Sequence, residues 1–217
     1  MSPDNHNLLL PMFSPMAQPP GKRYRTIVAD PPWGAVARSP IRFNGKKTAT
    51  NDYATMTNEE ITGLPIGMWA AEDSHLYLWA LNNNLPAAHR ILTAWGFDFK
   101  TLITWVKGRF EHGRLVHHFG LGQYFRNSTE HVLFGTRGSA PIMNHDTPTA
   151  FVAPRTDHSE KPATFYDMVE HVSPGPYLDV FARKQRMGWD CFGNEAYNPS
   201  ELLATLTDEQ SDGLVPA

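Results

Sequence analysis

Short apolar segments alternate along the chain with segments of helical periodicity, and this alternation limits the possible folds more than any other feature. Thr57 and Glu60 have the spacing of a helix capping box, Gly96 ends a second helix, and Pro162 suits the first turn of a third. Strands that alternate with helices predict an α/β fold with a mainly parallel sheet and helices on both faces. Strands are predicted over 24–30, 75–81, 100–107, 129–138, 150–154, 177–183 and 188–195, and helices from 57, over 84–96 and over 161–175.

The chain is long enough for one substantial core, since it has 217 residues of which 41% are hydrophobic. Its two ends are polar or rich in proline and show no apolar periodicity, which is typical of segments without a core of their own. We therefore expect a flexible N-terminal arm over 1–22, one folded domain over 23–198 and a flexible acidic tail over 199–217.

Cysteine content and hydropathy favour the cytoplasm. The single cysteine, Cys191, allows no internal disulfide framework and no thiolate cluster for zinc. No positively charged segment precedes the leucines near the N-terminus, and nowhere do about eighteen apolar residues follow one another. We expect neither secretion nor a membrane span.

The segment IVADPPWG, residues 27–34, ends a predicted strand with an acid, two prolines and a tryptophan. Prolines have a fixed φ angle and no N–H, so Pro31 and Pro32 make a stiff turn after Asp30. Open α/β sheets bind ligands beyond the carboxyl ends of their strands, which is where Asp30 is expected. Trp33 offers a flat apolar surface suited to stacking with a nucleobase. The segment therefore predicts a ligand site.

Two basic stretches stand out in a chain whose formal net charge is −3. The first, within a long loop over 34–53, contains no acid between 38 and 47, and the second is a long loop after residue 107 in which Glu111 is the only acid. Clustered basic residues are typical of phosphate binding, although solvated loops with no ligand have the same composition. The candidate nucleic-acid-binding residues are Arg38, Arg42, Lys46, Lys47, Lys107, Arg109, Arg114 and Arg126.

Four groups of motifs occur together and in order: ADPPWG; HLYLWAL with AWGF and ITWVKG; HSEKP; and YLDVFARKQRMGWDCFGNE. In this combination the chain resembles the MT-A family of adenine-N6 methyltransferases, which includes the S-adenosylmethionine-binding subunit of the mRNA adenosine methyltransferase, and in particular its small bacterial and phage members. The resemblance spans residues 24–198. It implies a Rossmann-like methyltransferase fold in permuted order, in which the catalytic DPPW motif precedes the cofactor motif.

The resemblance also implies S-adenosylmethionine as cofactor and assigns residues to two sites. Lys161 would meet the methionine carboxylate, and the cofactor residues from Asp179 onward would line the ribose and the adenine. The catalytic residues would be Asp30, Pro31, Pro32 and Trp33, and the cofactor-binding residues would be Asp30, Lys161, Asp179, Phe181, Arg183, Asn194 and Glu195.

The chemistry of an adenine amine agrees with this assignment. The amine is a poor nucleophile because its lone pair is delocalised into the ring, so a catalyst must hold its hydrogens while the nitrogen becomes pyramidal. Asp30 would accept one N–H and the carbonyl of Pro31 the other, and positioning and electrostatics would lower the barrier without a metal. A base in a duplex must first leave the stack. We therefore expect methylation of adenine N6 in nucleic acid, and in DNA first.

Two alternatives stay open. One is methylation of RNA, because nothing in the sequence identifies a reader of the 2′-hydroxyl. The other is a catalytically silent nucleic-acid-binding partner of an active methyltransferase, although Asp30, Lys161 and Asn194 favour activity. No separate target-recognition domain is evident, so specificity is either low or supplied by a partner subunit or a second copy of the chain.

Other chemistries are less well supported by the residues. His117 and His118 are adjacent and would point to opposite faces of a strand, so we expect no metal site. The chain has no Gly-x-Ser-x-Gly motif of the serine hydrolases. Four tryptophans lie in apolar strand or helix patterns and are expected in the core: Trp69, Trp79, Trp95 and Trp105.

Overall fold

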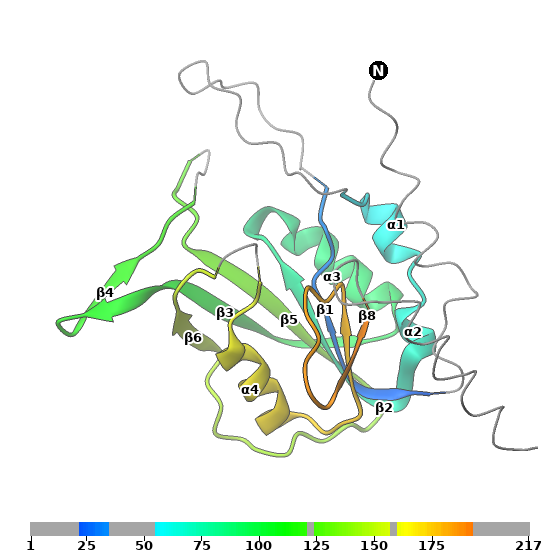
Figure 1. The fold of residues 1–217 in the computed structure, drawn as a ribbon. Coiled ribbons are helices and arrows are strands. Elements are labelled where there is room, and N and C mark those ends of the chain that lie inside the picture. The colour runs from blue at the N-terminus through cyan, green and yellow to red at the C-terminus, as the bar shows by residue number, and fades with distance from the viewer. Residues whose placement is uncertain (1–21, 35–54, 121–123, 157–159, 193–217) are drawn as a thin grey trace, which may run out of the picture.

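A computed structural model describes residues 22–34, 55–120, 124–156 and 160–192, which form an eight-stranded sheet with helices on both faces (Figure 1). The strands are β1 (Tyr24–Ala29), β2 (Ala70–Ala80), β3 (Asp98–Glu111), β4 (Arg114–His117), β5 (Thr129–Arg137), β6 (Ala150–Ala153), β7 (Tyr177–Val180) and β8 (Trp189–Phe192). Their order is β4-β3-β5-β2-β1-β7-β8, and β6 pairs with β3. The β1 strand, which ends just before Asp30, thus lies inside the sheet with a neighbour on each side.

The sheet is mixed, whereas the sequence predicted a mainly parallel one. Around β1 the prediction is correct: β1 is parallel to β2 and β7, and β7 is parallel to β8. Beyond β2 it is wrong, because β5 lies between β2 and β3 and is antiparallel to both. The alternation of strand and helix reveals the crossover from β2 to β3, but it does not reveal that a later strand is inserted between them.

The helices cover the two faces of the sheet. One face carries α1 (Asn58–Thr62), α2 (Ile66–Trp69) and α3 (Leu85–Ala94), and the other carries α4 (Ala163–Val172). Trp69, Trp79, Trp95 and Trp105 are all at most 4% exposed, which confirms that they belong to the core.

Local signals locate the helix ends well. Thr57 and Glu60 form the predicted capping box, with both reciprocal hydrogen bonds present. Gly96 follows α3 with a φ of 86°, a conformation that glycine adopts without strain. Pro162 is the N-cap of α4, so it stands just before the first turn rather than in it.

A buried polar network joins the strands to the end of α4. The Ser173 hydroxyl lies 2.7 Å from both His75 Nδ1 and the Tyr77 hydroxyl. The other ring nitrogen of His75 meets the carbonyl of Ala140 at 3.0 Å, so it carries the proton. Burial lowers the pKa of His75, which keeps the imidazole neutral.

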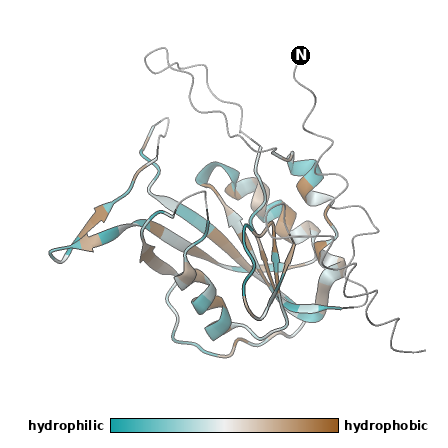
Figure 2. Cartoon of the chain, in the orientation of Figure 1, coloured by the Kyte–Doolittle hydropathy of each residue, from teal (hydrophilic) through white to brown (hydrophobic). Residues whose placement is uncertain are grey.

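A β-hairpin replaces the loop that was predicted after residue 107. The β3 strand continues to Glu111 and pairs with β4 through a turn at His112 and Gly113, both with positive φ. The hairpin projects from the sheet in Figure 1, and Figure 2 shows apolar segments on it. Phe110, for example, is 65% exposed. Because neither face of the hairpin is buried, its sequence lacks the alternation of apolar and polar residues that marks a strand.

Several predictions lie outside the described residues. These are residues 1–21 of the predicted arm over 1–22, the tail over 199–217, the basic residues Arg38, Arg42, Lys46 and Lys47, and the cofactor candidates Asn194 and Glu195. Among the described residues, no helix has the length and apolar content needed to cross a membrane.

Candidate active site

Asp30 lies at the edge of the sheet where β1 and β7 both end. The parallel register pairs Ala29 with Val180, and the Asp30 N–H donates to the Val180 carbonyl over 3.3 Å. The Trp33 N–H donates to the Pro31 carbonyl over 2.8 Å, which closes a three-residue turn centred on Pro32. The DPPW segment is therefore a rigid turn at the carboxyl end of β1.

Trp33 has a structural role in this turn. Its side chain belongs to the core and is 8% exposed. The indole N–H donates to the carbonyl of Trp79 over 3.0 Å, and the Trp33 backbone bridges to Met56. The indole thus anchors the turn to β2, and its role as a stacking surface for a base stays a prediction.

Lys161 reaches Asp30 from the segment that precedes α4. Its ammonium lies 2.8 Å from Asp30 Oδ2 and 3.1 Å from Glu130 Oε2, with the side chains of Lys161 and Asp30 9% and 23% exposed. The same ammonium stands 4.8 Å from the ring centroid of Trp79. Glu130 also pairs with Lys107 through its other oxygen. Two acids and two lysines therefore form one chain of ion pairs, which we name the charge cluster.

The charge cluster controls ionisation at this edge. Burial raises the pKa of the Asp30 carboxyl, and the Lys161 ammonium offsets part of that rise. Burial acts to lower the pKa of Lys161, but Asp30 and Glu130 outweigh it and the net direction is upward. For Glu130, Lys161 and Lys107 outweigh burial, and its pKa is lowered. Lys161 is thus an ammonium at neutral pH and holds the Asp30 carboxylate in one orientation.

A second acid, Asp179, belongs to the end of β7 and is 5% exposed. The Tyr166 hydroxyl donates to its Oδ2 over 2.8 Å. Burial raises the pKa of Asp179 to about 7, although the hydrogen bond from Tyr166 acts in the opposite direction. Phe181 is the first residue after β7. Its φ of 71° is rare for a side chain of its size and turns the chain away from β7.

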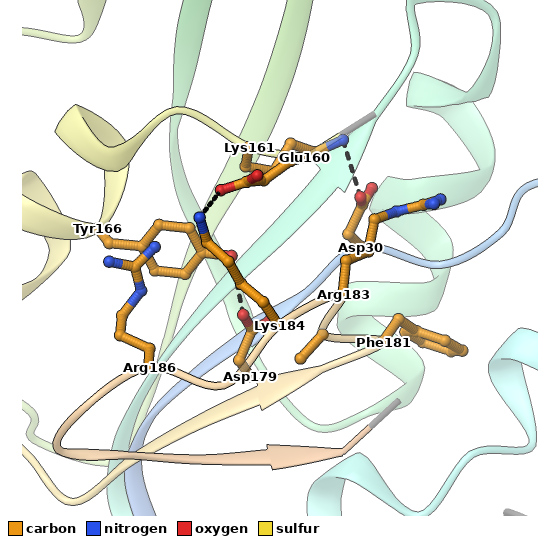
Figure 3. A pocket seen from close by; sticks show the side chains of 10 residues that line it. Asp30, Glu160, Lys161, Tyr166, Asp179, Phe181, Arg183, Lys184 and Arg186 are labelled. Atoms are coloured by element: carbon orange, nitrogen blue, oxygen red, sulfur yellow. Dashed lines mark hydrogen bonds and ion pairs between the residues drawn. The ribbon is translucent and has the colours of Figure 1, made fainter. Parts of the chain in front are cut away.

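Five predicted cofactor residues come together around one pocket. Figure 3 shows Asp30, Lys161, Asp179, Phe181 and Arg183 around it, contributed by the end of β7, by the segments that follow β1 and β7 and by the segment that precedes α4. Arg183 lies close enough to Asp30 to act on the pKa of its carboxyl. An ion pair between Lys184 and Glu160 spans the pocket. The free volume of the pocket in this arrangement is about 20 Å³.

Sequence reasoning missed Glu160 and Lys184, which line the pocket, and it also missed Glu130 and Tyr166. Glu130 is an acid near the start of the apolar strand TEHVLFG, and a charge in such a strand is a signal of a buried partner. Tyr166 lies on the buried face of α4, where it is indistinguishable by pattern from a core residue. Neither Glu130 nor Tyr166 stands out until the strand order is known.

The predicted nucleic-acid-binding residues among the described ones lie along or near the hairpin. Trp105 and Lys107 point to the α4 face of β3, and strand alternation continues this face to Arg109. Arg109 pairs with Glu111 at 2.6 Å, and Arg114 stands opposite Glu111 in the register. A basic stripe thus leads outward from the charge cluster on one side of the sheet. Arg126 is exposed, in the segment that leads back to β5.

Comparison with protein families identifies the chain. The MT-A70 family model matches residues 24–195, which is most of its length. The chain belongs to the MT-A70 family. Membership confirms the resemblance found in the sequence and implies a Rossmann-like methyltransferase fold, and MT-A70 methyltransferases use S-adenosylmethionine.

Individual relatives in the MT-A70 family differ in how much of their length is matched. The Type II methyltransferase M.MunI of Mycoplasma sp is 27% identical over 201 residues, which cover 85% of this chain and 83% of that protein. The METTL3 subunit of an N(6)-adenosine-methyltransferase from Danio rerio is 26% identical, over 89% of this chain but 32% of its own length. Human METTL3 is 27% identical, again over 32% of its length. This MT-A70 member thus spans about a third of its METTL3 relatives.

In the described part of the chain, no group of three or more His, Cys, Asp or Glu side chains is arranged to hold a metal ion. The chemical groups that converge at the site are carboxylates, ammoniums, guanidiniums and aromatic rings.

Proposed function

We propose that this protein is an S-adenosylmethionine-dependent methyltransferase that methylates the N6 amine of adenine in DNA. The observation that carries the proposal is the Asp30 carboxylate, presented at the end of β1 and oriented by Lys161 at 2.8 Å. It borders the pocket that contains the remaining described cofactor candidates.

The donor set of the pocket suits the cofactor. Lys161 offers an ammonium for a carboxylate, Asp179 an acceptor for ribose hydroxyls, and Phe181 an aromatic ring for an adenine. The ion pair of Lys184 with Glu160 must open to admit a ligand of nucleoside size, and these side chains are 59% and 36% exposed, so opening costs little. In sequence, the catalytic motif after β1 precedes the cofactor motif in β7, and we propose this permuted order for the site.

In the reaction, S-adenosylmethionine supplies an electrophilic methyl group bonded to a sulfonium. The residues of the chain act on the amine. Asp30 accepts one N–H and the Pro31 carbonyl, which has a second lone pair beside its bond to Trp33, accepts the other. Held in this way, the nitrogen would be able to become pyramidal and use its lone pair, and the cofactor would supply the methyl group and leave as a neutral thioether. The excess proton on nitrogen leaves through Asp30 to water.

DNA is preferred to RNA because of the match to M.MunI. That match covers 83% of a Type II methyltransferase, a class that acts on DNA, whereas each METTL3 match covers 32%. The METTL3 names favour RNA as the second candidate. We further propose that residues 23–198 form the catalytic domain, that the protein acts in the cytoplasm, and that a partner subunit or a second copy contributes to specificity.

The test is transfer of a labelled methyl group to DNA and RNA of matched sequence, single- and double-stranded, followed by digestion to nucleosides. We expect N6-methyladenine in DNA with the unaltered protein. Asp30→Asn should reduce transfer by at least about 100-fold, because the amide replaces a charged acceptor. Asp167→Asn, an exposed change on α4, is the matched control and should retain full activity.

Each alternative has its own outcome. Label in N6-methyladenine of RNA alone would replace DNA by RNA as substrate. Label in cytosine would overturn the assignment to adenine. Cofactor binding without transfer to any polymer would favour the silent partner, and full activity of Asp30→Asn would overturn the mechanism.

A further inference from the structure

A second cavity lies at the base of the β3–β4 hairpin, outside the pocket described above. Its volume is about 210 Å³, and it lies between the end of β2, the hairpin, the start of β5 and the segment after β6. A protein cavity of roughly 150 Å³ is known to admit benzene, so this one has room for the ring of a nucleobase. Six of the residues that line it carry the argument: Asn82, Asn83, Lys107, Phe119, Asn127 and Arg155.

The lining residues have the chemistry of a nucleotide site. Phe119 is 66% exposed and presents a ring for stacking. Asn82 and Asn83 are exposed amides, each with donors and acceptors of the kind that read base edges. Arg155 supplies positive charge for a phosphate, and Lys107 adds a second charge that its ion pair with Glu130 partly offsets. Among the described lining residues there is no acid, so the charge favours an anionic ligand over a cationic or purely apolar one.

The charge cluster connects this cavity to Asp30. Lys107 lines the cavity and pairs with Glu130, which shares Lys161 with Asp30. The cavity is therefore two ion-paired side chains away from the catalytic acid. Lys107 and Lys161 also lie on the same side of the sheet, since both pair with Glu130. A nucleic-acid strand whose adenine reaches Asp30 can therefore pass the cavity without crossing the sheet.

We propose that this cavity binds one nucleotide next to the target adenine, with its base on Phe119 and its phosphate near Lys107 and Arg155. The inference rests on the proposed function, and it adds a subsite for a neighbouring base. Such a subsite makes the protein read sequence context and favours substrates whose bases are unstacked, because a base paired in a duplex cannot lie flat on Phe119.

The test compares two exposed phenylalanines of equal accessibility. Phe119 lines the cavity and is 66% exposed, whereas Phe110 lies on the hairpin, outside the cavity, and is 65% exposed. The probe is a fluorescent single-stranded DNA 12-mer with one adenine, whose binding is followed by anisotropy. We expect Phe119→Ala to weaken binding by about 5- to 150-fold, the range for loss of one stacked base. Phe110→Ala should bind as the unaltered protein does.

A second arm locates the base. An abasic site is placed in turn at each position around the adenine. One neighbouring position should weaken binding to the unaltered protein, and Phe119→Ala should show no further loss at that position. Three outcomes would each overturn the subsite. They are unchanged DNA binding by Phe119→Ala, equal losses of affinity in Phe119→Ala and Phe110→Ala, and a loss from Phe119→Ala that adds to the loss from the abasic site at every position.

Failure of the two proposals looks different. If the unaltered protein transfers no methyl group to any polymer, the proposed function fails. If it methylates DNA and Phe119→Ala binds that DNA normally, the subsite alone is wrong.

Discussion

Asp179→Asn should make the protein more stable at neutral pH, although the variant loses a buried charge that binds the hydroxyl of Tyr166. The folded carboxyl of Asp179 has a pKa of about 7, against an ordinary value of 3.8. Between these two pH values the folded state keeps a proton that the unfolded state has lost. The free energy of unfolding must therefore fall as the pH rises from about 4 to about 7, and remain lowered above that.

The shift of about 3 pKa units corresponds to about 4 kcal/mol at most, since each unit is about 1.4 kcal/mol. An asparagine cannot ionise, and its side-chain oxygen still accepts the hydrogen bond from Tyr166. If the asparagine stands in for the protonated acid, the variant should exceed the unaltered protein by about 2 kcal/mol near pH 5 and by about 4 kcal/mol at pH 8, and the two should match only below about pH 4.

The assay is urea denaturation of both proteins at several pH values between 5 and 9, with the exposed Asp167→Asn as control. The free energy of unfolding is plotted against pH for the variant and for the unaltered protein. The difference between these two plots removes the contribution of every other titrating group. A stability difference that does not change with pH, or a variant less stable at pH 8, would refute the reasoning. Cofactor binding by Asp179→Asn is expected to weaken at the same time, which separates the role of this acid in function from its cost in stability.

Two further substitutions test the packing. Ser173→Ala removes a hydroxyl that hydrogen-bonds two buried side chains, and should lower the free energy of unfolding in urea by about 2 kcal/mol, whereas the exposed Ser139→Ala should change it by less than about 0.5 kcal/mol. Gly138 and Gly113 have φ angles of 65° and 76°, but only at Gly138 would a methyl group collide, with the Asp73 carboxylate and the backbone carbonyl of Glu72. Gly113→Ala should therefore cost about 1 kcal/mol of strain and Gly138→Ala clearly more in thermal denaturation, and equal losses would contradict the collision.

Local signals account for the parts of the site that were predictable. Two strand ends can be recognised from neighbouring residues alone. One lies between the apolar run before Asp30 and the prolines after it, and the other lies in the apolar segment around Asp179. Lys161 precedes a helix whose start Pro162 indicates. The structure brings Asp30, Lys161, Asp179, Phe181 and Arg183 to one pocket, so the positions were predictable even though their distances were not.

The remaining parts depend on neighbours far away in the sequence. Glu130 joins the charge cluster only because β5 enters the sheet between β2 and β3 in the reverse direction. Tyr166 becomes a partner of Asp179 only when α4 packs over β7. The hairpin was taken for a loop because it has no buried face and hence no apolar alternation.

By itself, the sequence determined the family and most helix and strand positions, and it predicted Asp30 as the catalytic acid, because motifs, caps, turns and hydrophobic periods involve residues a few positions apart. Only the tertiary structure decided the mixed direction of the sheet, the ion pairs that orient Asp30 and the cavity beside them. These depend on contacts such as Lys161 with Asp30, more than a hundred residues apart. Their energies come from burial and charge proximity, which exist only after the strands have taken their order.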